Sequence, residues 1–174
     1  MHKITLFGLT LLSLLFSSVS CKKEALKIIP EDYASWARTT QLELNYPIPG
    51  HMEHYRRIYI NEKGKGVTTE IRKDRLYYEY PKGTIIVKEV FPTLTPAADE
   101  KPMALTVMVK DPDNPESRGG WVWVAKNMQT AVETVFNYEF CFDCHTNANE
   151  VHPYGDKNPN NEFRDYVYFP YKGE

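Results

Sequence analysis

The chain has 174 residues and a formal net charge of −2, a length that suits one domain with a single hydrophobic core. Its 42% hydrophobic and 25% charged residues are typical of a globular protein rather than a disordered one. Because the charge is slightly acidic, the chain lacks the basic footprint expected of a nucleic-acid-binding protein, and we expect no nucleic-acid partner.

The first twenty residues have the arrangement of an export signal. A short basic start, which includes Lys3, precedes an apolar run at residues 4–16, and small residues follow. The run is shorter than the ~20 apolar residues that span a bilayer. We therefore expect residues 1–20 to be a signal peptide and the protein to be exported to the periplasmic side.

Cys21 stands directly after this signal and resembles the acylated cysteine of bacterial lipoproteins, although Ser18 occupies a position where leucine is usual. Ordinary cleavage at the same bond, which leaves a free thiol, is the alternative. An unpaired exposed thiol is unusual in an exported protein. We expect a membrane-anchored lipoprotein in which residues 21–29 are the lipidated cysteine and its tether, and residues 30–174 form the domain.

The body of the chain contains short strand-like runs separated by glycine and proline turns. We expect one short helix at residues 30–39, a second from about 128 to 136, and a third at the CxxCH motif near the C-terminus. Short strands joined by turns favour an antiparallel sheet, so the predicted fold class is α+β: an antiparallel β-sheet packed with a few helices and a C-terminal CxxCH segment. Runs rich in β-branched and aromatic residues predict strands at residues 56–60, 84–91, 103–109 and 120–125.

Cys141, Cys144 and His145 form the CxxCH motif, which indicates covalent attachment of one haem c. Positions i, i+3 and i+4 share one face of a helical turn. Each cysteine can then reach a porphyrin vinyl group while His145 ligates the iron. Two alternatives remain open: a zinc site with His152 as the fourth ligand, and a redox or structural cysteine pair.

The methionines bear on the sixth iron ligand. None follows Met128, so an axial sulfur would have to come from upstream, as an electron-transfer cytochrome with a six-coordinate haem would require. His51 and His54 are further candidates, although surface or hydrogen-bonding roles suit them better. The methionines in question are Met52, Met103, Met108 and Met128.

The chain resembles the cytochrome P-460 family, which also contains the cytochromes c′-beta, over roughly residues 30–171. Residues 151–163 look like an insertion relative to the short link that is usual in this family. The resemblance implies an antiparallel β-sheet packed with helices and an assembly that is often a homodimer. It rests on HYRRIYIN at 54–61, KGTIIVKEVF at 82–91, GGWVWV at 119–124, and CFDCHTNA at 141–148 followed by DYVYFPY at 165–171.

Lys88 is the first candidate for a residue on the distal side of the haem, opposite His145. In a strand it shares a face with Ile86 and Val90, and both faces are mostly apolar, so a lysine there is costly without a partner. A lysine that extends to a sheet edge is the alternative. The resemblance implies that Lys88 matches the lysine that P-460 members cross-link to the porphyrin edge, or that it lines the distal pocket, since cytochromes c′-beta need not show the link.

Thr106 is the second distal candidate, because residues 103–111 match the strand that carries a distal carboxylate in hydroxylamine-oxidising members. A threonine cannot act as a carboxylate base at neutral pH; Glu89 and Glu100 are alternative carboxylates. The resemblance implies a five-coordinate iron that binds, oxidises or reduces small nitrogen oxides, nitric oxide or hydroxylamine, with a periplasmic electron-transfer partner. A non-catalytic gas-binding lipoprotein is a further alternative.

Overall fold

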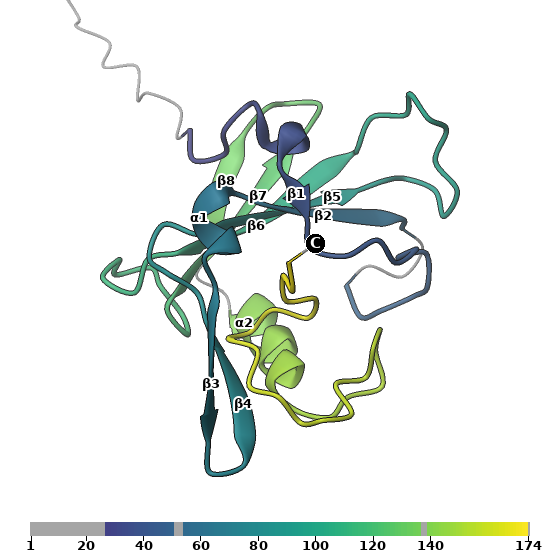
Figure 1. Cartoon of the computed structure of the whole chain (residues 1–174). Coiled ribbons are helices and arrows are strands. Elements are labelled where there is room, and N and C mark those ends of the chain that lie inside the picture. Colours follow the sequence, from purple (N-terminus) through teal and green to yellow (C-terminus); the bar gives the residue numbers. More distant parts are fainter. Residues whose placement is uncertain (1–26, 51–53, 137–138, 174) are drawn as a thin grey trace, which may run out of the picture.

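A six-stranded sheet forms the body of the protein in the computed structural model, which describes residues 27–50, 54–136 and 139–173. Every pair of neighbouring strands is antiparallel (Figure 1). The export signal and Cys21 lie outside the described residues. The strand order is β1 (Ala37–Arg38), β2 (Arg56–Ile60), β5 (Ile85–Val90), β6 (Ala104–Lys110), β7 (Trp121–Asn127) and β8 (Glu133–Phe136).

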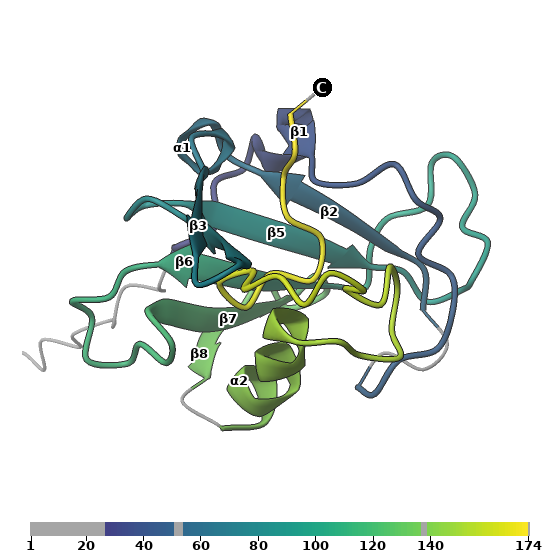
Figure 2. The same ribbon diagram turned by 60° about the horizontal axis from the view of Figure 1, so that its bottom comes forward.

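Helix α2 (Glu139–Thr146) and the C-terminal segment after it lie on one side of this sheet (Figure 2). A separate hairpin of β3 (Thr68–Arg72) and β4 (Arg75–Glu79) projects from the body. The remaining elements are short: the 3-10 helices η1 (Tyr33–Ser35) and η2 (Asn147–Asn149), and α1 (Glu62–Lys65). No helix among the described residues is both long enough and apolar enough to cross a bilayer.

The two faces of the sheet bury separate hydrophobic clusters, as the period-two alternation of strand side chains requires. On the face toward α2, Ile86, Met108 and Trp123 pack with Val167 of the C-terminal segment. On the other face, Val87 and its neighbours pack around Ile29 at the start of the described chain. The alternation predicted for residues 85–91 is therefore the observed one.

The fold class is confirmed in its coarse form, a mostly antiparallel β-sheet with few helices, and the four predicted strands correspond to β2, β5, β6 and β7. The helix expected at 128–136 is wrong. Asn127 Oδ1 accepts hydrogen bonds from the backbone N–H groups of Gln129 and Thr130 (2.8 and 3.1 Å), which makes a turn. The chain then returns as β8, whose β-branched Thr134 and Val135 pair with β7.

The helix expected at residues 30–39 is also wrong, because only a single 3-10 turn forms there. That turn, η1, ends before Trp36, whose backbone is extended. Ala37 and Arg38 then pair with β2 as the edge strand β1. Tertiary pairing thus overrides the local helical tendency of this segment.

Candidate haem-binding site

An open cavity lies between the sheet and the α2 side of the molecule. Its empty space is about 1240 Å³, a figure that includes the open solvent at the mouth. The walls are mainly apolar. The lining residues come from the loop before β2 (Leu44, Tyr46, Ile48, Pro49, Gly50), from β2 (Arg56, Ile58), β5 (Ile86, Lys88), β6 (Thr106, Val107, Met108), β7 (Trp123, Val124) and β8 (Phe136), from α2 (Phe140, Cys141, Cys144, His145), and from the C-terminal segment (Tyr154, Gly155, Val167, Tyr168, Phe169).

Helix α2 brings the three CxxCH side chains to this cavity. Cys141, Cys144 and His145 all line it, as neighbours one turn apart on a helix do. Neither cysteine is in a disulfide. Burial raises the pKa of the Cys141 thiol, while the positive charge of Lys88 opposes that effect.

His145 is held in one orientation by the C-terminal segment. Its Nδ1 lies 2.7 Å from the backbone carbonyl oxygen of Tyr166, so Nδ1–H donates and Nε2 is the nitrogen left for a metal. The rings of Trp123 and Tyr168 pack edge-on against the imidazole, with centroids 4.8 and 5.2 Å away. Burial, followed by the charge of Lys88, lowers the pKa of His145 to about 4 although the Tyr166 hydrogen bond raises it. The imidazole is therefore neutral at physiological pH, as ligation requires.

The carbonyl of Tyr166 is itself fixed by a buried ion pair. Lys110 Nζ lies 2.7 Å from Asp165 Oδ2, and Trp121 Nε1 donates to the Asp165 carbonyl oxygen at 2.9 Å. Asp165 and Tyr166 both have positive φ, +50° and +67°, an uncommon backbone that needs external support. Asn149 Oδ1 supplies part of it by accepting the Tyr166 N–H at 3.0 Å.

Lys88 and Thr106 meet on the sheet wall of the cavity. They are directly paired across β5 and β6, and both line the cavity. Since β5 lies between β2 and β6, Lys88 is on an interior strand and not at a sheet edge. Burial, followed by the charge of Arg56, lowers the pKa of Lys88 to about 8, against the opposing influence of the two cysteines.

A family model described as cytochrome P460 matches residues 30–169. The chain belongs to the cytochrome P460 family. No curated protein matches the chain. Membership implies a c-type haem protein. The residues present fit haem, because two thiols outside any disulfide and an imidazole whose Nε2 is left for a metal share one wall of a mainly apolar cavity.

This cytochrome P460 chain has its carboxylate candidates away from the cavity. Glu89 lies on the opposite face of the sheet, where the hydroxyls of Tyr33 and Tyr59 donate to it at 3.1 and 3.3 Å. Glu100 accepts the backbone N–H of Ala97 in a loop. Among the described residues, no aspartate or glutamate lines the cavity.

Of the candidate sixth ligands, Met108 lines the cavity, whereas Met103 and Met128 are exposed elsewhere. His54 is not among the lining residues. Met52 and His51 lie outside the described residues.

The zinc alternative finds no support in residues 27–50, 54–136 and 139–173, where no three histidine, cysteine or acidic side chains are grouped to hold a metal. His152 is buried against the rings of Tyr154 and Tyr168 instead.

Arg56 is a cavity residue that sequence reasoning missed. Its guanidinium donates to the carbonyl oxygens of Leu44 and Tyr46, at 3.2 and 2.7 Å, and thereby holds the loop at the cavity wall. Asp165, Lys110 and the Tyr166 carbonyl were missed too. The only signal for Asp165 and Tyr166 was the DYVYFPY run, and Lys110 had no signal of its own, since no local pattern connects residues 110, 145 and 165.

Proposed function

We propose that this cytochrome P460 protein carries one haem c, covalently attached through Cys141 and Cys144 and ligated by His145, with an iron position left open for a small nitrogen oxide. Nitric oxide and hydroxylamine are the ligands we expect it to bind, oxidise or reduce. The haem supplies the redox chemistry and the ligand-binding iron. The observation that carries the proposal is the single cavity that collects the CxxCH side chains, Lys88 and Thr106.

The residues of the chain have separate roles in this proposal. The Tyr166 carbonyl orients His145, and the apolar walls exclude water from the haem faces. On the sheet wall, Lys88 either bonds to the porphyrin edge or donates hydrogen bonds into the pocket. Thr106 offers a hydroxyl that donates and accepts, but it cannot serve as a base at neutral pH. This polar set suits binding of nitric oxide better than base-assisted oxidation of hydroxylamine.

The cellular setting belongs to the same proposal. Residues 1–20 direct export, acylated Cys21 anchors the mature protein to a membrane on the periplasmic side, and an electron-transfer protein exchanges electrons with the haem. A homodimer is the expected assembly by resemblance to the family. The order of basic, apolar and small residues before Cys21 supports export.

Electron transfer is the second candidate function, and Met108 favours it because its side chain lines the cavity. A thioether ligand would make the iron six-coordinate. An absorbance signature of methionine–histidine ligation would support this function and count against an open iron. Ligand binding without turnover of hydroxylamine or peroxide would instead indicate a gas-binding lipoprotein.

The deciding experiment is the absorbance spectrum of the reduced protein, with and without nitric oxide, after expression in a host that matures c-type cytochromes. We expect a coloured protein that keeps its colour through acid–acetone extraction and whose spectrum changes with nitric oxide. A colourless preparation, or a low-spin spectrum that nitric oxide does not alter, contradicts the proposal. A strongly red-shifted Soret band that Lys88→Ala abolishes would establish the cross-link; an ordinary haem c spectrum would leave Lys88 as a pocket residue only.

A further inference from the structure

Three large apolar residues at adjacent strand ends of the sheet have exposed side chains. Met103, Met128 and Val132 are 45%, 36% and 56% exposed. The Met128 N–H donates to the Met103 carbonyl oxygen at 3.2 Å. The Asn127 N–H donates to the carbonyl oxygen of Val132, also at 3.2 Å. These three residues, the strand-end patch, therefore occupy adjacent strand ends of β6, β7 and β8.

The described chain enters the fold beside this patch. The backbone N–H groups of Ile28 and Ile29 both donate to Glu133 Oε2, and Glu133 directly follows Val132. Lys126 Nζ lies 3.2 Å from the other carboxylate oxygen of Glu133. Ile29 is buried in the hydrophobic cluster on the face of the sheet that points away from α2. The first described residues are thus fixed next to the patch.

The length of chain before this entry point limits where an anchor at Cys21 can lie. Five residues lie between Cys21 and Lys27, and an extended chain spans ~3.5 Å per residue step, or about 20 Å in all. Lys22 and Lys23, against the single acid Glu24, make this tether basic, whereas Lys27 is paired with Glu31 at 2.8 Å. Basic residues are attracted to anionic lipid headgroups.

We propose that the strand-end patch docks on the lipid bilayer that holds acylated Cys21. The inference rests on the lipid anchor of the proposed function and adds a defined orientation to it. A short tether keeps the patch at a high effective concentration near the lipid, which favours an apolar contact too weak to form between separate molecules.

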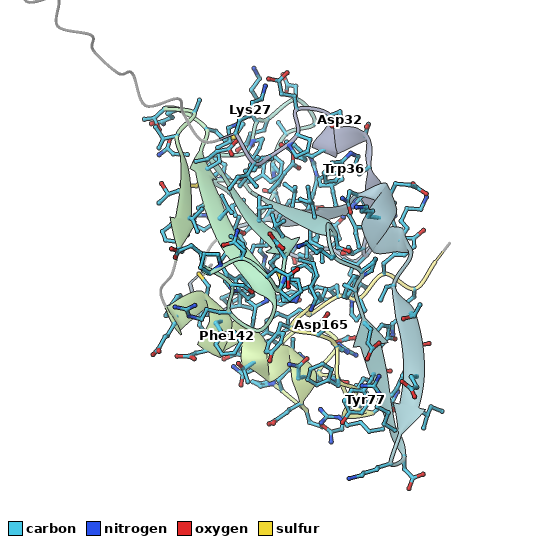
Figure 3. All side chains as sticks on the ribbon, turned by 90° about the vertical axis from the view of Figure 1, so that its left-hand side faces the viewer. Lys27, Asp32, Trp36, Tyr77, Phe142 and Asp165 are labelled. Atoms are coloured by element: carbon cyan, nitrogen blue, oxygen red, sulfur yellow. The ribbon has the colours of Figure 1, made fainter. Side chains whose placement is uncertain are left out.

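Docking at this end directs the haem side away from the membrane. Figure 3 shows Lys27 at one end of the molecule and Tyr77 of β4 at the other, with Phe142 of α2 displaced from Lys27 in the same direction as Tyr77. The β3–β4 hairpin and the CxxCH helix then face the periplasmic solvent. An electron-transfer partner or a dissolved ligand approaches from that side.

The test is the labelling rate of a single introduced cysteine in the lipidated, haem-loaded protein on vesicles of phosphatidylethanolamine and phosphatidylglycerol. Val132→Cys reports on the patch. Ile71→Cys on β3, where the native side chain is 72% exposed, is the matched control at the far end. A water-soluble maleimide is the reagent. The reference for each variant is the same protein with Cys21→Ser, secreted without lipid and labelled in buffer.

We expect labelling of Val132→Cys to slow about tenfold on vesicles, because a millimolar effective concentration leaves the patch docked nine-tenths of the time if the dissociation constant of the contact is about 0.1 mM. Labelling of Ile71→Cys should keep its rate. Adding Met103→Glu and Met128→Glu should restore the rate at Val132→Cys. Equal rates at Val132→Cys with and without vesicles would overturn the inference, and so would slow labelling in buffer, which would mean that a second copy covers the patch.

The same preparations separate this inference from the proposed function. If the lipidated protein floats with the vesicles and Val132→Cys stays reactive, docking fails while the anchor holds. If the protein does not float with the vesicles, the lipid anchor at Cys21 is contradicted, and so is docking of the patch, which depends on that anchor. Fast labelling of the Cys21→Ser chain without an introduced cysteine would show that Cys141 or Cys144 is a free thiol, which contradicts haem attachment independently of the membrane.

Discussion

Asp165→Asn should destabilise the protein and disturb the proximal side of the haem. Asp165 and Lys110 are paired at 2.7 Å, with only 8% and 14% of their side chains exposed. Asparagine tolerates the positive φ of +50° at this position, so the substitution removes charge without adding backbone strain. Removing one member of a buried pair leaves the other charge uncompensated, which costs about 3–5 kcal/mol.

The magnitude should fall near the lower end of that range, about 3 kcal/mol, because an amide oxygen can still accept hydrogen bonds from Lys110 and Trp121. For a domain of this size that loss lowers Tm by roughly 10 °C. Burial raises the pKa of Asp165 more than Lys110 lowers it, so the intact pair itself adds little stability. Breaking it is what destabilises the fold.

The assay is urea unfolding of four haem-loaded proteins: the parent chain, Asp165→Asn, Lys110→Met and the double variant. The double variant should recover much of the loss, giving a coupling energy of at least about 1 kcal/mol. The reduction potential of Asp165→Asn should also shift, because the Tyr166 carbonyl that orients His145 follows Asp165 directly. Additive losses together with an unchanged potential would refute this reasoning.

Three further outcomes follow from the structure. Burial favours a raised pKa for Asp156, but its hydrogen bond and ion pair with Arg164 lower it overall. This contribution to stability is fully present above the ordinary carboxyl pKa of about 4 and is lost on acidification through the lowered pKa. Asp156→Asn should therefore flatten the fall in unfolding free energy between about pH 5 and about pH 2. An equally steep fall in the variant would show that other carboxylates control it. Gly119→Ala should cost about 1–3 kcal/mol in thermal unfolding, because its Cβ would lie 2.7 Å from aromatic rings. Gly173→Ala is the matched control for backbone strain, since Gly173 also has a positive φ but its Cβ would have nothing within 4 Å. Equal losses in the two variants would rule out the steric cause. Met108→Leu should leave the reduced spectrum and nitric oxide binding unchanged if the iron has no thioether ligand, and a changed spectrum would support the electron-transfer function.

Local patterns in the sequence predicted the parts of this protein that depend on one segment at a time. The alternation of Ile86 and Lys88 with Val87 and Glu89 gave the correct faces of a strand, because side chains of a strand point alternately to its two faces. The spacing of Cys141, Cys144 and His145 predicted a shared wall, and the three side chains do line one cavity on a helix.

The same local reasoning failed where distant partners decide the conformation. Residues 133–136 form a strand and not a helix because β7 offers an edge to pair with, and no pattern within the segment reveals that edge. Thr106 faces Lys88 through the register of two strands. Glu89, in contrast, lies on the other face of the sheet, as the strand alternation predicted.

Sequence alone thus determined four of the strands and the shared face of the CxxCH residues, because helix and strand periodicities are properties of a few consecutive residues. Tertiary structure decided how the site is built. The orientation of His145 depends on a carbonyl 21 residues later, and that carbonyl depends on an ion pair between residues 110 and 165. Such contacts arise only when the sheet and the C-terminal segment pack together, since burial and pairing are set by neighbours in space and not by neighbours in the chain.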